Sequence, residues 1–280
     1  MLIKDTEEWA NNLFEHAELG DERRTKRLIK LSHLMASNSG SSIVKASGSP
    51  ASIEGAYRFL RNDKIKANDI ANAGFSSLLP DLKRSNKMLA LEDTSTLCYR
   101  HNVTEDLGHT GAYKKSSSKG ILAHTVLMID AETEHTIGLA EQHRWCRKDE
   151  NFGTANDRKR RKYETKESYK WQRSSEAMSL RYASVMDNII SVCDRESDMF
   201  EYIDYKNKQN QRFVVRAKHE RMINAQGDRL TPYIEKQSSP LSYQVKIQQK
   251  GGRKARIANI AVRYALVTIF PRKSTENVKV

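Results

Sequence analysis

Apolar residues recur at helical spacing through the first 85 residues of the chain. Three such groups lie within residues 9–14, 28–35 and 53–60, which predicts three amphipathic helices. Asp21 is a suitable N-cap for the second helix, and Ser49, which precedes a proline, is suitable for the third. The pattern therefore predicts a compact helical module at the N-terminus.

After this module the chain changes to short apolar runs separated by polar segments. An apolar run begins at Met88 and ends in two carboxylates, and the segments 121–129 and 136–140 have the pattern of a β-hairpin. Further along, the spacing predicts a helix over 171–187, a strand over 189–193, a helix around 200–203 and a strand over 212–218. Three strands followed by helix, strand, helix and strand is the order of an RNase H-like fold, an α/β architecture with a mixed sheet flanked by helices.

The last part of the chain is predicted to be β-rich. Alternating apolar residues over 243–247 and an apolar segment over 257–270 predict two further strands. We therefore divide the chain into a helical module (1–86), an α/β core (87–220) and a β-rich region (221–280).

Two of the predicted strands end in carboxylates. Asp93 closes the first strand, directly after Glu92, and Asp194 closes the strand that begins at residue 189. In the RNase H-like order these strands are neighbours, so the two side chains would project from adjacent strand ends. Two close carboxylates repel each other unless a cation lies between them, and Mg²⁺ or Mn²⁺ prefers such oxygen ligands. The alternative is that Asp93 caps a turn and Asp194 caps the following helix.

Positive charge is concentrated at the C-terminal end. Residues 206–280 contain 17 Lys and Arg but 4 Asp and Glu, whereas residues 87–205 contain 18 and 20. This distribution predicts a cation-binding centre followed by a surface for a polyanion such as nucleic acid. A solvated basic tail is the simpler alternative. The charged segment 147–170 is predicted to be an exposed loop, with nucleic-acid contact as its alternative role.

The remaining composition narrows the class of protein. At 280 residues with 30% charged residues, the chain is expected to form a soluble globular protein without a membrane span. Its three cysteines, Cys98, Cys146 and Cys193, have no short-range pairing and predict reduced thiols. The acidic residues near the N-terminus argue against a signal peptide, so we expect a cytoplasmic protein.

Five blocks of sequence, in the same order, resemble the bacterial cut-and-paste DDE transposases of the insertion-sequence-four group, which include the transposase of the kanamycin-resistance transposon (Tn-five). The blocks are Leu19–Thr25, Glu54–Asn62, Leu91–Thr94 with Tyr99–His101, Val192–Asp198, and Arg212–His219. The resemblance implies a DNA-binding N-terminal module, an RNase H-like catalytic core, an inserted β-region, and association with double-stranded DNA in the bacterial nucleoid.

The resemblance also implies roles for individual residues. Asp93 and Asp194 would be the first two metal-binding catalytic carboxylates. Arg216 and Lys218 would contact DNA near the cleavage site. The N-terminal module would recognise the terminal inverted repeats of the transposon through Arg27, Arg58 and Arg61. Ser37-Asn38 replaces a Lys-Tyr pair of the best-known relative, so the preferred end sequence is expected to differ.

One part of the family pattern has no match. The third catalytic carboxylate of the family is a Glu on a helix that follows the β insertion, and the acidic residues after the last matched block, Glu220, Asp228, Glu235 and Glu276, lack that context. We therefore expect a truncated or split transposase that is inactive alone, although the intact family forms homodimers on DNA. The alternative is a non-catalytic DNA-binding remnant that interferes with a full-length copy.

Overall fold

The computed structural model describes residues 5–99, 107–110, 119–147, 160–223, 227–270 and 278–279. These residues form two compact units: unit 1 comprises Met1–Asp194 with Gln211–Val214, and unit 2 comprises Arg195–Asn210 with Val215–Val280. Parts of the sequence considered above lie outside the described ranges, namely Arg100 and His101 of the third block, residues 148–159 of the charged segment, and Glu276. The predicted domain boundaries at 86 and 220 stay predictions.

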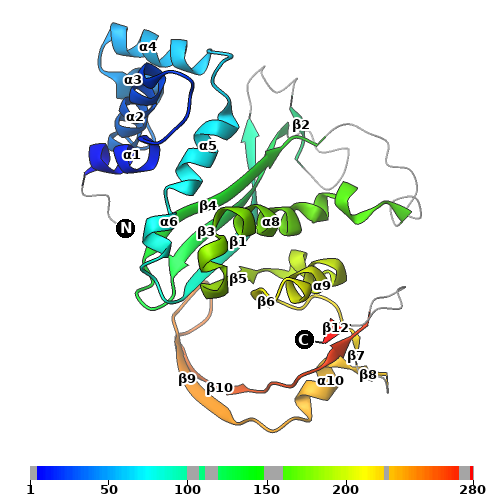
Figure 1. Ribbon diagram of the computed structural model, residues 1–280. Helices are drawn as coiled ribbons and strands as arrows, with labels where there is room; N and C mark the ends of the chain where they lie inside the picture. The colour runs from blue at the N-terminus through cyan, green and yellow to red at the C-terminus, as the bar shows by residue number, and fades with distance from the viewer. Residues whose placement is uncertain are drawn as a thin grey trace. The chain divides into compact units, whose positions relative to one another are not determined.

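Unit 1 begins with a set of helices (Figure 1). They are α1 (Thr6–Phe14), α2 (Glu22–Ser37), α3 (Ile43–Ser47), α4 (Pro50–Leu60), α5 (Ala67–Ser76) and α6 (Leu79–Leu82). The two predicted caps are confirmed, because the Asp21 side chain accepts a hydrogen bond from the Arg23 N–H and the Ser49 hydroxyl accepts one from Ser52. Leu28, Leu31 and Phe59 are among the residues of a buried core that joins α2 to α4.

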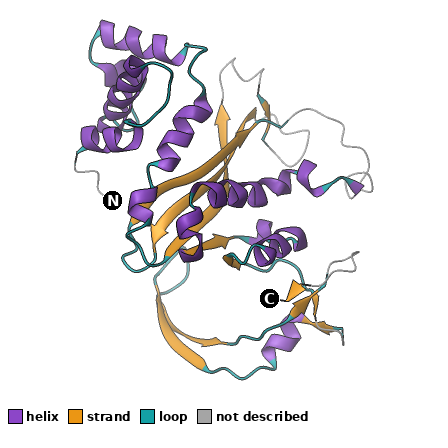
Figure 2. Cartoon of the chain, viewed as in Figure 1, coloured by secondary structure: helices purple, strands orange, loops and turns teal. Residues whose placement is uncertain are grey.

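The sheet of unit 1 is mixed, which confirms the α/β class (Figure 2). Its strands are β1 (Met88–Tyr99), β2 (Gly108–His109), β3 (Lys119–Asp130), β4 (Thr136–Trp145), β5 (Ile189–Cys193) and β6 (Arg212–Val215). The order is β2-β3-β1-β5-β6, and β4 pairs with β3. β1 is antiparallel to β3 and parallel to β5. β3 and β4 pair antiparallel, so the predicted hairpin is confirmed.

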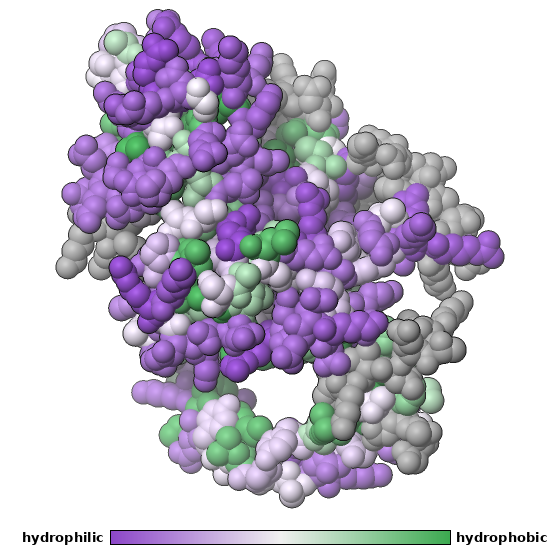
Figure 3. Space-filling view, viewed as in Figure 1, coloured by the Kyte–Doolittle hydropathy of each residue, from purple (hydrophilic) through white to green (hydrophobic). Residues whose placement is uncertain are grey.

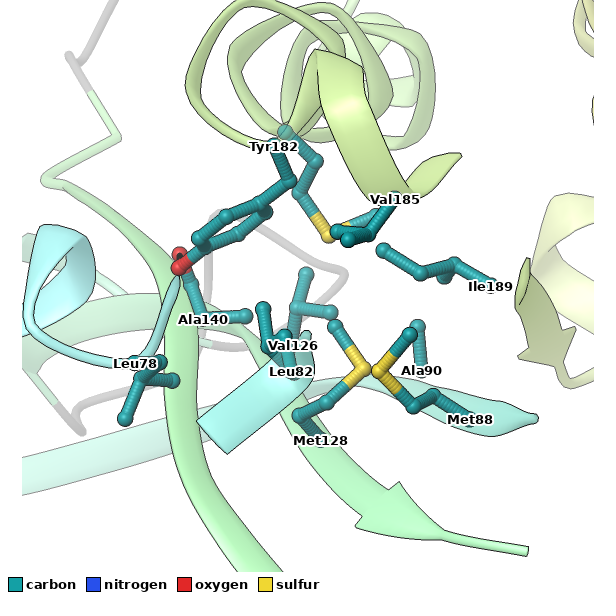
Figure 4. Packing of buried hydrophobic residues seen from close by; sticks show 11 residues of the cluster. Leu78, Leu82, Met88, Ala90, Val126, Met128, Ala140, Tyr182, Val185 and Ile189 are labelled. Atoms are coloured by element: carbon teal, nitrogen blue, oxygen red, sulfur yellow. Dashed lines mark hydrogen bonds between the residues drawn. The ribbon is translucent and has the colours of Figure 1, made fainter. Parts of the chain in front are cut away.

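A core of apolar residues fixes this sheet to the helices. In Figure 4, Met88 and Ala90 of β1 lie near Val126 and Met128 of β3, with Leu78 and Leu82 from the α6 region and Tyr182 above them. Tyr182 follows helix α8 (Lys170–Arg181), and its hydroxyl donates to the carbonyl oxygens of Phe75, at 2.6 Å, and Ala140, at 3.3 Å. Burial raises the pKa of this hydroxyl to about 12. Tyr182 thus ties the end of α8 to both α5 and β4.

Unit 2 contains two small sheets and two helices in its described part. The 3-10 turn η5 (Arg195–Ser197) and helix α9 (Phe200–Lys208) come first, and α10 (Leu230–Glu235) follows later. One sheet has the order β12-β11-β7-β8, and the other is the antiparallel pair of β9 and β10. These strands are β7 (Met222–Ile223), β8 (Asp228–Arg229), β9 (Leu241–Ile247), β10 (Arg256–Val262), β11 (Thr268–Ile269) and β12 (Val278–Lys279).

Several of the predicted elements have the wrong limits. β4 continues from its predicted end at residue 140 to Trp145. β1 continues to Tyr99 because its whole length pairs with β3, so Asp93 lies within a strand and not at its end. Helix α8 ends at Arg181, where a 3-10 segment, η4 (Ala183–Asn188), replaces the predicted helical turn. β6 ends at Val215, so the predicted strand does not extend to residue 218, and the segment 257–270 divides into β10 and β11.

Two expectations about composition can be compared with the structure. Cys98, Cys146 and Cys193 form no disulfide. Within the described ranges, none of the helices combines the length and the apolar character that crossing a membrane requires.

We predict that Tyr182→Phe lowers the free energy of unfolding by about 0.5–1.5 kcal/mol, because the buried hydrogen bond of 2.6 Å to the Phe75 carbonyl is lost, while that carbonyl still accepts from the backbone N–H of Leu78. Urea denaturation followed by tryptophan fluorescence measures this, since Trp9, Trp145 and Trp171 all belong to unit 1. Tyr57→Phe is the control, because Tyr57 lies at the surface of the same unit. An equal stability of both variants would contradict the anchoring role.

Candidate functional site

Asp93 and Asp194 come together at one position of the sheet. The parallel register of β1 and β5 pairs Met88 with Ile189 and continues to Glu92 with Cys193. Asp93 follows Glu92 and Asp194 follows Cys193, and both aspartates are exposed. Because Glu92 and Cys193 are buried, alternation along the strands turns the next two side chains to the opposite face. The two residues therefore follow paired positions of neighbouring strands, although only Asp194 follows the end of its strand, and their predicted role as a metal-binding pair stays a prediction.

The turn-cap alternative for Asp93 is wrong, because this residue pairs with Thr125 inside the antiparallel ladder. The alternative for Asp194 stays open. Asp194 directly precedes η5, which is the position that a capping residue would take.

Glu92 and Asp93 differ sharply in environment despite being neighbours in sequence. Glu92 is only 4% exposed, and its carboxylate lies 3.6 Å from Nε2 of the fully buried His124 on β3. The other ring nitrogen of His124, Nδ1, shares a hydrogen bond of 2.9 Å with the Thr94 hydroxyl. The His124 ring also meets Trp171 of α8 edge to face, with 4.5 Å between ring centroids. Both Glu92 oxygens and His124 Nε2 have no hydrogen-bond partner among the described residues, so this buried polar group is only partly satisfied.

The importance of Glu92 and His124 was missed at the sequence level. A signal was present, because His124 interrupts the otherwise apolar run 121–129. A single buried polar residue in such a run implies a partner, since a polar group buried without one is costly. What the sequence lacked was the register that pairs His124 with Thr94, its hydrogen-bond partner, and brings Glu92 near it.

Carboxylate oxygens of Asp93 and Asp194 are suitable ligands for a hard divalent cation. Within the described ranges, no group of three or more His, Cys, Asp and Glu side chains is arranged to hold a metal ion. The pair is thus compatible with two ligands of a metal centre, and the predicted lack of a matched third carboxylate stays a prediction.

The basic residues Arg216 and Lys218 lie in a loop of unit 2 and not on a strand. Both side chains are exposed in the segment between β6 and β7. Burial alone would raise the pKa of Asp198, but hydrogen bonds from Arg221 and from the N–H groups of Lys218 and His219 lower it below its usual value. The charged form of Asp198 therefore holds this loop.

Three arginines belong to the region of α2 and α4. Arg58 is exposed on α4 and pairs with Glu54 at 2.6 Å. Arg61, the residue directly after α4, is also exposed, and its guanidinium lies 5.4 Å from the centre of the Tyr57 ring. Together with Asn62, these residues line an open surface groove of about 420 Å³. Figure 3 shows that hydrophilic residues cover most of the visible surface of the N-terminal helices.

Arg27 reaches from α2 to α4. A Cβ atom added to Gly55 of α4 would lie 2.8 Å from one guanidinium nitrogen of Arg27 and 2.9 Å from the carbon. Gly55 and Arg58 are three residues apart and so share one side of the helix. The structure therefore brings Arg27 close to the α4 side that carries Arg58, and Gly55 leaves the room for its side chain.

Comparison with known families finds a match in this helical region. Residues 6–65 match the family model described as transposase DNA-binding. The match begins with α1 and ends shortly after α4, so it includes Arg27, Arg58 and Arg61. It supports a transposase-family protein whose N-terminal helices bind DNA.

We predict that Gly55→Ala weakens DNA binding roughly three- to tenfold without destabilising the fold. The new Cβ displaces the Arg27 guanidinium, so a cation that is expected to contact a DNA phosphate moves from its position. Alanine is the better helix former by about 1 kcal/mol, so stability alone would not fall. Fluorescence anisotropy with a labelled duplex measures the binding.

Gly74→Ala on α5 is the matched control. Its added Cβ lies at an ordinary contact distance of 3.4 Å from the Phe14 ring and touches no basic residue. If Gly55→Ala binds DNA with unchanged affinity, or if both variants lose the same affinity, the result would count against a DNA-binding role for Arg27.

Proposed function

We propose that this chain is part of a cut-and-paste DDE transposase of the insertion-sequence-four group, which recognises the terminal inverted repeats of its transposon. The observation that carries the proposal is the in-register pairing of β1 with β5, which places Asp93 beside Asp194 in a chain with a transposase DNA-binding segment. Neither feature alone would specify this function.

The sheet order supports an RNase H-like core. β4, β3 and β1 form an antiparallel meander, β5 is parallel to β1 on its other side, and β6 follows β5 in the order. Helix α8 connects the meander to β5 and packs its Met178 into the core below. This is the arrangement that the RNase H-like element order requires, with the acidic positions on the two central neighbours.

The proposed cofactor is Mg²⁺, or Mn²⁺, held by Asp93 and Asp194. Bound there, such a cation would activate a water or a 3′-hydroxyl and stabilise the leaving oxygen of a phosphodiester. The chain's own contribution would be to hold Asp93 on a strand that is paired on each side, with Asp194 directly after the neighbouring strand. Preorganised ligands of this kind do not have to be ordered when the cation arrives.

The proposed DNA contacts divide into two groups. Arg27, Arg58 and Arg61 on the matched helices would contribute to recognition of the terminal repeat, and the Tyr57 side chain adds an aromatic surface beside Arg61. Arg216 and Lys218 would contact phosphates near the reacting strand. The intact enzyme would act as a homodimer in the bacterial cytoplasm, associated with the nucleoid.

A second candidate function is a DNA-binding protein without catalysis, which occupies transposon ends and interferes with a full-length copy. The DNA-binding match supports it equally well, because it covers residues 6–65 and includes neither of the two acidic positions. The reading frame downstream of the gene separates the two candidates. A frame that encodes a helix with the expected Glu favours a split enzyme, and a frame without it favours the non-catalytic protein.

We predict that binding to the inverted repeats that flank the gene falls steeply with salt, and that Arg216→Ala weakens it and lowers the slope of log affinity against log salt by about one. The physical reason is that each phosphate-bound cation releases one condensed counterion. Lys208→Ala is the control with the same loss of charge, because Lys208 pairs with Asp204 on α9. Binding that does not respond to salt would be inconsistent with the phosphate contacts.

We also predict that the purified chain nicks a terminal-repeat substrate only very slightly in the presence of Mg²⁺. Two carboxylates bind a catalytic metal less completely than three. A gel assay of labelled strands measures the nicking. Robust cleavage that disappears in Asp93→Ala would show that a third ligand exists within the chain and that its expected absence is wrong.

A further inference from the structure

A buried carboxylate organises the basic loop of unit 2. Asp198 is 5% exposed and lies between η5 and α9. Its Oδ2 accepts hydrogen bonds from the backbone N–H of Lys218, at 2.6 Å, and of His219, at 3.0 Å. Its Oδ1 accepts a hydrogen bond from the Arg221 guanidinium, which also donates to the Asp198 carbonyl oxygen at 3.0 Å. The Asp198 side chain thus accepts hydrogen bonds from three residues of the loop, Lys218, His219 and Arg221.

The other end of the loop is held separately. The Arg221 carbonyl oxygen accepts a hydrogen bond from the Leu230 N–H at 3.0 Å, and the Glu220 side chain accepts one from the Thr231 N–H at 3.0 Å. Both donors lie at the start of α10. The backbone from Lys218 to Arg221 is therefore fixed on two sides, while the Lys218 side chain stays exposed.

The two arginines of this segment have different environments. Arg221 has a side chain that is only 15% exposed and forms an ion pair with the buried Asp198. Its positive charge is thus neutralised inside the fold, and its role is internal. Arg216 and Lys218 carry exposed side chains. The loop therefore offers fewer cations to a ligand than its sequence contains, but offers them from an anchored backbone.

We propose that Asp198 is a positioning residue for DNA binding, which acts by fixing the backbone from which Lys218 meets a phosphate. The proposal rests on the function proposed above. A cation on a fixed backbone loses less conformational freedom when it binds than one on a mobile loop. An acidic residue would on this basis promote binding to a polyanion.

The test exploits a difference in sign. Asp198→Asn removes one negative charge, so long-range electrostatics alone predicts tighter DNA binding. The positioning role predicts the reverse, because an amide has one acceptor oxygen and its NH₂ group must face either the two backbone N–H groups or Arg221. We expect affinity for a labelled terminal-repeat duplex to fall roughly five- to tenfold near 0.1 M salt, with a salt slope lower by about one.

Two further variants separate positioning from a general change of structure. Asp204→Asn is the matched control, since it removes the same charge from a more exposed ion pair on α9 in the same unit, and it is expected to bind as well as the wild type or better. In the double variant Asp198→Asn with Lys218→Ala, the two losses should not add, because both remove the same phosphate contact. Additive losses, or an Asp198→Asn variant that binds as tightly as the wild type, would overturn the proposal.

Hydrogen exchange keeps the proposal testable if Asp198→Asn does not fold. In the wild type, the amides of Lys218 and His219 should exchange at least tenfold more slowly than in an unstructured peptide, and exchange at the peptide rate would overturn the anchoring. If the wild-type protein binds no DNA, both the proposed function and the positioning role of Asp198 are wrong. If the wild type binds terminal repeats and Asp198→Asn binds them equally well, only the positioning role is wrong.

Discussion

The alternation of buried and exposed residues along β1 is the constraint on which the rest of the carboxylate site depends. Met88, Ala90 and Glu92 are buried, and the residues between them face the other side of the sheet. A slip of one residue in the pairing would exchange the two faces. Asp93 would then be buried and Glu92 exposed. The apolar core beneath the sheet therefore determines which of the two neighbouring carboxylates is available at the surface.

The same constraint places a polar group inside the core. Glu92 is put on the buried face by the register, and His124 approaches it from the antiparallel strand, with Nε2 at 3.6 Å from the carboxylate. Thr94 shares a hydrogen bond with the other nitrogen of the same ring. Neither Glu92 oxygen nor His124 Nε2 has a hydrogen-bond partner among the described residues. A buried polar group without such a partner is costly, so the packing of the strands, and not this contact, keeps Glu92 inside.

Much of the secondary structure followed from local pattern, and the errors arose where distant contacts decide. The caps at Asp21 and Ser49 are local, and both were predictable. The continuation of β1 through Asp93 and Ser95 was not, because a polar segment is kept extended there by pairing with residues 119–125 of β3. Similarly, β6 ends before Arg216. The backbone N–H of Lys218 then donates a hydrogen bond to Asp198, 20 residues earlier in the sequence, and not to a neighbouring strand. The spacing of apolar residues gives no sign of such a contact.

Net charge is an incomplete guide to the site for the same reason. The segment 216–221 contains three residues that are Lys or Arg. One of them, Arg221, is paired with a buried carboxylate and contributes little to the electrostatic potential at the surface. Arg58, by contrast, pairs with Glu54 at the surface, where an ion pair is worth little and is easily exchanged for a phosphate. The burial of the acidic partner therefore separates a structural cation from one that DNA can recruit. Composition counts both alike, and only the folded chain distinguishes them.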